Sequence, residues 1–83
     1  MQSQQMKEKI REYIARNFLA PGAAFSDQDP LFSRGRIDSL GHLKLISFLE
    51  KEFQVSLSID DLSWENFDTV DSIQALVKKR LGR

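Results

Sequence analysis

The chain is short, electrically balanced and devoid of cysteine. It has 83 residues, with 12 basic and 12 acidic side chains and no net charge at neutral pH. A chain of this length has one modest core and little room for an enclosed active site, so we expect a single domain over residues 1–83 that is not an enzyme. The absence of cysteine excludes disulfides and thiolate sites, and one histidine cannot by itself build a metal site.

The N-terminal residues 1–6 are polar and lack an apolar signal core. No segment approaches the roughly 20 apolar residues that span a bilayer. We therefore expect no secretion and no membrane insertion, but a free-standing, monomeric protein in the cytoplasm. Zero net charge without a basic recognition helix argues against a nucleic-acid partner.

The first expected element is an amphipathic helix over residues 4–19. Apolar side chains recur along it at helical spacing, while charged side chains fill the other face. The apolar set is Met6, Ile10, Tyr13, Ile14 and Phe18. Pro21 and Gly22 end this helix.

Residues 20–38 show no sustained period, which predicts a long loop. Loops of this length in small domains are functional or disordered. Leu31, Phe32 and Ile37 favour an ordered loop anchored by apolar side chains, with one short helical turn near Pro30.

The second helix is expected over residues 39–53, with Asp38 or Ser39 as its N-cap. Its expected inward stripe is Leu43, Ile46, Leu49 and Phe53, with Leu45 alongside.

A brief helical turn is expected after residue 57, with Ser58 as its cap and Asp61 completing a capping box. Trp64 and Phe67 are expected in the core. The acidic side chains between residues 60 and 71 lack calcium-loop spacing and are expected to form a solvated face. The last helix begins near Asp68 or Thr69. Its core stripe is Val70, Ile73, Val77 and Leu81, with Leu76 alongside.

Together these elements predict an all-α fold. It is a small bundle of three to four helices with a long loop between the first and second helices.

Ser39 stands at the start of the second helix, where its simplest role is to cap that helix. A serine nucleophile needs a base within hydrogen-bond reach, and His42 could share a helix face with it. However, no Gly-x-Ser-x-Gly turn or oxyanion hole accompanies the pair, and we expect His42 at the surface. We therefore expect no catalytic residue. If Ser39 reacts, another protein must supply the base.

The residues around Ser39 resemble those of a known family. The pattern reads Leu31-Phe32-x-x-Gly35-x-x-Asp38-Ser39-Leu40, followed by an apolar helix that ends Leu49-Glu50-x-Glu52-Phe53. It resembles the acyl carrier proteins and peptidyl carrier domains over nearly the whole chain. The resemblance implies that Ser39 carries 4′-phosphopantetheine, which a phosphopantetheinyl transferase adds from coenzyme A. The thiol of this arm then holds an acyl or aminoacyl group as a thioester, while Asp38 helps to position the transferase and its magnesium.

Several details resemble D-alanyl and aminoacyl carriers more than fatty-acid carriers. Gly35 stands four residues before Ser39, whereas fatty-acid carriers place their glycine three before. Residues 65–69 resemble a segment of D-alanyl and peptidyl carriers. Fatty-acid carriers also place carboxylates after the serine, where this chain has Gly41, His42 and Lys44. The expected partner-recognition residues are Asp38, Leu40, His42, Lys44 and Ser47.

The resulting hypothesis is a carrier outside primary fatty-acid synthesis. Its partners would be the transferase, an acyl- or aminoacyl-activating enzyme, and a downstream acyltransferase or synthase. Two alternatives stay open. One is a helical protein-interaction module without a prosthetic group, in which Ser39 only caps its helix; the other is a fatty-acid-type acyl carrier protein.

Overall fold

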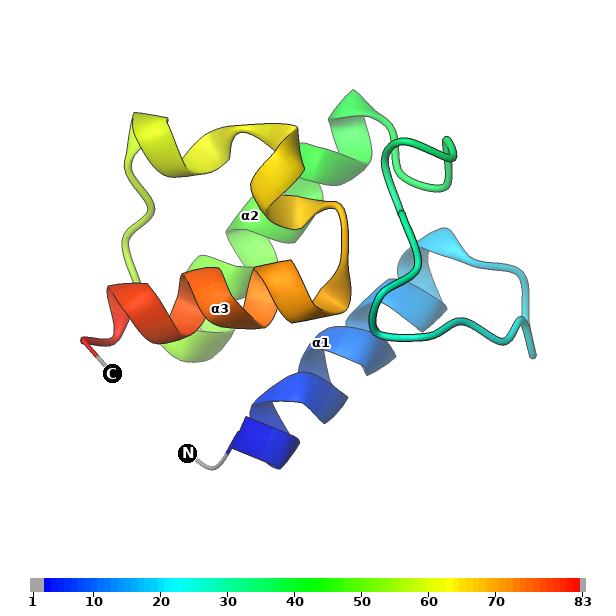
Figure 1. Ribbon diagram of the computed structural model, residues 1–83, viewed down its shortest axis with the longest axis horizontal. Coiled ribbons are helices and arrows are strands. Elements are labelled where there is room, and N and C mark those ends of the chain that lie inside the picture. Colours follow the sequence, from blue (N-terminus) through cyan, green and yellow to red (C-terminus); the bar gives the residue numbers. More distant parts are fainter. Residues whose placement is uncertain (1–2, 83) are drawn as a thin grey trace.

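Three α-helices and two short 3-10 helices make up the computed structural model, which describes residues 3–82 (Figure 1). The elements are α1 (Ser3–Phe18), α2 (Ser39–Phe53), η1 (Ile59–Leu62), η2 (Trp64–Phe67) and α3 (Val70–Arg80). Residues 3–82 contain no strand, so the all-α prediction is confirmed. In this part of the chain no helix is both long and apolar enough to cross a membrane.

The core lies where α1, α2 and α3 meet. Met6, Ile10 and Ile14 of α1 are buried, as their spacing predicted. The predicted stripe of α3 is also confirmed, except that Leu81 is only partly buried. Because α1 packs against α3, the first and last helices of the chain are held together.

The predicted inward face of α2 is partly wrong. Leu43 is 62% exposed, whereas Leu45 and Leu49 are fully buried. The reason lies at Gly41, where an added Cβ would stand 2.8 Å from Ile37 Cγ2. This close approach turns the Gly41 edge of α2 inward. The buried residues that follow at four-residue spacing, Leu45 and Leu49, form what we call the α2 contact line, and Leu43 is left in solvent.

The loop between α1 and α2 is ordered, as predicted. Leu31 and Ile37 are buried and anchor it to the core. The turn expected near Pro30 is a hydrogen-bonded turn rather than a helical one, with the Gly35 N–H donating to the Phe32 carbonyl at 2.9 Å. Figure 1 shows this loop at the side of the molecule where α1 ends and α2 begins.

Two acidic residues between positions 60 and 71 are structural, which corrects the expectation of a solvated face. Asp61 is 4% exposed, closes the predicted capping box with Ser58 and bonds to Arg80 at 2.8 Å. Asp68 accepts hydrogen bonds from the loop before α2. Trp64 corrects another expectation, because 48% of it is exposed rather than buried in the core.

Candidate functional site

Ser39 is the first residue of α2, and its neighbour Asp38 caps the helix. The Asp38 carboxylate accepts the Gly41 N–H at 2.8 Å, and the Asp38 carbonyl accepts the His42 N–H at 2.9 Å. Asp38 rather than Ser39 is therefore the N-cap. Since the Ser39 hydroxyl does not cap the helix and the residue is exposed, this hydroxyl is open to modification.

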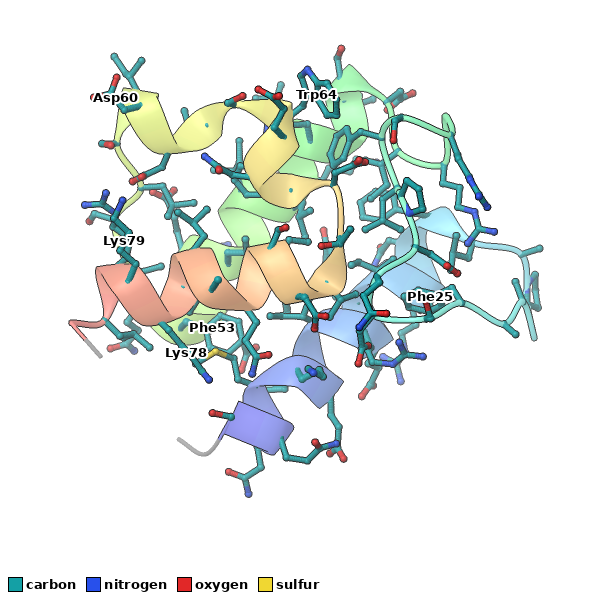
Figure 2. All side chains as sticks on the ribbon, in the orientation of Figure 1. Phe25, Phe53, Asp60, Trp64, Lys78 and Lys79 are labelled. Atoms are coloured by element: carbon teal, nitrogen blue, oxygen red, sulfur yellow. The ribbon has the colours of Figure 1, made fainter. Side chains whose placement is uncertain are left out.

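Ser39 borders an open cleft of about 580 Å³, which we call the Ser39 cleft. Three segments meet there: the loop before α2, the first turn of α2, and the η1–η2 connection. Its lining residues are Phe32, Ser33, Ile37, Asp38, Ser39, His42, Leu62 and Trp64. Figure 2 shows Trp64 beside the start of α2.

The loop wall of the Ser39 cleft is held by Asp68. One carboxylate oxygen of Asp68 accepts the Phe32 N–H at 2.7 Å and the Ser33 N–H at 3.1 Å, and the other accepts the Ser33 hydroxyl at 2.8 Å. Partial burial acts to raise the pKa of Asp68. The hydrogen bonds from Ser33, Phe32 and Leu31 outweigh it and keep that pKa below its usual value. Asp68, at the end of η2, is thus a charged anchor between the η2–α3 connection and the loop.

His42 lies in the inner part of the Ser39 cleft, which corrects the expectation of a surface residue. Its ring packs edge-on against Phe32 and Phe67, with centroid distances of 5.2 and 4.8 Å. The Nε2 atom is buried without a hydrogen-bond partner, and burial lowers the pKa of the imidazole. Because Nε2 has no hydrogen-bond partner, it does not bond to the Ser39 hydroxyl and forms no nucleophile–base pair with it.

The exposed face of α2 carries apolar and basic side chains. Leu40 and Leu43 are 61% and 62% exposed, and Lys44, Ser47 and Lys51 are also exposed. The carboxylates of α2 are engaged within the molecule, because Glu50 accepts the Leu57 N–H at 3.0 Å and Glu52 pairs with Lys9 at 2.8 Å. The dominant charge offered by this face is therefore positive.

Residues 8–78 match the family model described as the phosphopantetheine attachment site. The chain belongs to this family. Members of this carrier family bear covalent 4′-phosphopantetheine and act as carriers rather than as catalysts.

Named relatives of the chain are carrier proteins. A probable acyl carrier protein, PigG, from a Serratia species is 33% identical over 75 residues, which cover 89% of this chain and 86% of PigG. The D-alanyl carrier protein of Streptococcus uberis is 35% identical over 74 residues, covering 89% and 92% of the two chains. The D-alanyl carrier protein of Streptococcus suis is 31% identical over 68 residues, covering 82% and 85%.

The geometry around Ser39 fits the group that the carrier family bears. Ser39 is exposed at the N-terminus of a 15-residue helix, and the positive end of a helix dipole favours an attached phosphodiester. The adjoining Ser39 cleft has room for part of a flexible arm. Within residues 3–82 no three potential metal-binding side chains cluster.

The expected site residues fall into two groups. Asp38, Ser39 and His42 border the Ser39 cleft, whereas Leu40, Lys44 and Ser47 lie on the exposed face of α2. The role of all these residues in partner recognition stays a prediction. Sequence reasoning missed Leu43, Trp64 and Asp68 as parts of this region. The three-residue spacing of Leu40 and Leu43 was the one local signal for an exposed apolar pair.

Proposed function

We propose that the chain is a carrier protein in which Ser39 bears 4′-phosphopantetheine, and that it passes an acyl or aminoacyl group outside primary fatty-acid synthesis. The observation that supports this proposal most is that Ser39 is exposed at the mouth of the Ser39 cleft. Its hydroxyl does not cap α2, because Asp38 is the N-cap. When attached, the arm supplies a terminal thiol that holds the cargo as a thioester.

The attachment reaction needs a second protein. The Ser39 oxygen forms a bond to the coenzyme A phosphorus that bears pantetheine, the phosphoanhydride bond breaks, and adenosine 3′,5′-bisphosphate leaves. The hydroxyl proton passes to a base that the transferase supplies, since Nε2 of His42 makes no hydrogen bond to the Ser39 hydroxyl. Asp38 is exposed beside Ser39, where its carboxylate is suited to help position the transferase and its magnesium.

The proposed partners are a phosphopantetheinyl transferase, an acyl- or aminoacyl-activating enzyme, and a downstream acyltransferase or synthase. The proposed docking face comprises Leu40, Leu43, Lys44 and Ser47, which are exposed together on α2. A partner built for an acidic helix would meet Lys44 instead of a carboxylate, so partner choice shifts toward enzymes with complementary charge. The proposed location is the cytoplasm, where coenzyme A is available.

An aminoacyl or other non-fatty-acid cargo has two supports. Two of the relatives described above are named D-alanyl carrier proteins. The exposed face of α2 also lacks the run of solvent-facing carboxylates associated with fatty-acid carriers.

Intact-mass measurement tests the proposed attachment. Apo protein incubated with coenzyme A and a broad-specificity phosphopantetheinyl transferase should gain one phosphopantetheinyl group. Ser39→Ala should gain none, while the matched control Ser56→Ala, which alters an exposed serine outside the docking face, should be modified normally. No addition with several transferases would favour an interaction module without a prosthetic group.

A further inference from the structure

The ring of His42 lines the Ser39 cleft and also contacts a core residue. Its neighbour Phe32 lines the cleft as well. Its other aromatic neighbour, Phe67, is fully buried and does not line the cleft. The buried Nε2 of His42 has no hydrogen-bond partner. Burying such a group opposes folding, so its presence at this position calls for an explanation.

Core residues of α2 and α3 are fully buried and do not line the Ser39 cleft. Leu45 and Leu49, the residues of the α2 contact line, have no exposed surface. Ile73 of α3 is equally buried. Because protein interiors are packed at close to crystalline density, an alkyl chain that starts at Ser39 could enter the core only by displacing side chains that line the cleft, and among these His42 contacts the buried Phe67.

The accessible part of the Ser39 cleft suits a short, partly polar occupant. Its walls combine the aromatic rings of Phe32 and Trp64 and the aliphatic side chain of Leu62 with the hydroxyls of Ser33 and Ser39. The cleft is open to solvent, so a long alkyl chain lying in it would keep much of its surface in water and would gain little from burial.

We propose that His42 closes the inner end of the Ser39 cleft and thereby restricts sheltered cargo to a short acyl or aminoacyl group. This inference rests on the proposed attachment of the arm at Ser39. His42 acts as a determinant of cargo size: the arm and a small cargo lie outside the ring, and a long alkyl chain is excluded from the core.

The test compares short and long cargo on the intact protein. Apo protein would be loaded by a transferase directly from coenzyme A, acetyl-coenzyme A or octanoyl-coenzyme A, with loading confirmed by mass. Amide chemical shifts and thermal unfolding would then be measured for each form. In the wild-type sequence, the octanoyl and acetyl forms should have similar amide chemical shifts at Leu45, Leu49 and Phe67. The two forms should also melt at the same temperature.

Two substitutions at His42 test its role. His42→Ala should admit the octanoyl chain, shift the amides of Leu45, Leu49 and Phe67, and raise the melting temperature of the octanoyl form above that of its acetyl form by about 4 °C or more. His42→Phe preserves the bulk and should retain the exclusion. The matched control Ile59→Ala, at an exposed apolar position outside both the Ser39 cleft and the docking face, should behave like the wild-type sequence.

The possible failures are distinguishable. Absence of any mass increase refutes the proposed attachment. If the wild-type sequence is loaded and its core amide chemical shifts depend on the octanoyl group, the role of His42 is overturned. This measurement decides the matter even if His42→Ala fails to fold. Identical behaviour of folded His42→Ala and the unmodified sequence overturns it equally.

Discussion

Removing the Asp68 carboxylate should loosen the loop wall of the Ser39 cleft from the η2–α3 connection. In Asp68→Ala, the Phe32 N–H, the Ser33 N–H and the Ser33 hydroxyl all lose their acceptor. The Leu31 N–H is less affected, because it also donates to the Asp68 backbone carbonyl at 2.7 Å. The substitution therefore removes three hydrogen bonds for which residues 3–82 offer no other acceptor, and it leaves the fourth donor, the Leu31 N–H, satisfied.

The size of the effect follows from the charge and exposure of these groups. A hydrogen bond to a charged acceptor contributes about 1.5–3 kcal/mol, but neighbouring bonds are not additive and solvent can replace part of an exposed set. Ser33 is exposed and Phe32 is partly buried, so we expect a total loss of about 2–3 kcal/mol. For a domain of this size, that loss lowers the melting temperature by about 8–24 °C.

Urea and thermal unfolding followed by circular dichroism would measure this loss. Asp68→Asn retains acceptor capacity without the charge and should lose about half as much stability. The matched control Asp60→Ala changes an exposed carboxylate of the same acidic segment and should stay within about 0.5 kcal/mol of the unmodified protein. Equal stabilities for Asp68→Ala and Asp60→Ala would refute the anchoring role of Asp68.

Three further predictions follow from the same geometry. Gly41→Ala should destabilise the fold by about 1–2 kcal/mol in urea unfolding, because its Cβ would stand 2.8 Å from Ile37 Cγ2 and the clash exceeds the gain in helix propensity; a more stable variant would show that Ile37 moves aside freely. The lowered pKa of His42 means that the folded state binds fewer protons than the unfolded state, so the free energy of unfolding should fall as pH drops below about 6.5. Because the chain has one histidine, His42→Phe should make the free energy of unfolding less dependent on pH between about 5.5 and 7.5. An unchanged slope of that free energy against pH would contradict a lowered pKa for His42. Lys44→Glu should leave stability within about 0.5 kcal/mol and raise the KM of an activating or transfer enzyme for the carrier, whereas an unchanged KM with every partner tested would remove Lys44 from the docking face.

The fold was largely predictable because its helices have clear local signals. The apolar spacing of α1, the stop at Pro21 and the Ser58–Asp61 capping box each depend on residues close together in the sequence. The rotation of α2 was not predictable in this way. Leu43 and Leu45 both continue plausible stripes, and the choice depends on the approach of Gly41 to Ile37, a contact made by the loop.

The candidate site was predictable at Ser39 but not in its surroundings. The motif indicated Asp38 and Ser39, and the structure assigns the cap to Asp38. By contrast, the burial of His42 depends on Phe67, which lies far along the chain, and Asp68 reaches the N–H groups of a loop about 35 residues earlier. Such long-range contacts leave no local periodicity in the sequence.

Locating the modification within the chain tests the central claim most directly. Cleavage after Arg36 and Lys44 releases the peptide 37–44, in which Ser39 is the only residue with a hydroxyl group. After incubation with coenzyme A and a phosphopantetheinyl transferase, fragmentation mass spectrometry should find one phosphopantetheinyl group on this peptide and none elsewhere. An unmodified 37–44 peptide from protein that has gained the group, or a chain that no transferase modifies, would contradict the account.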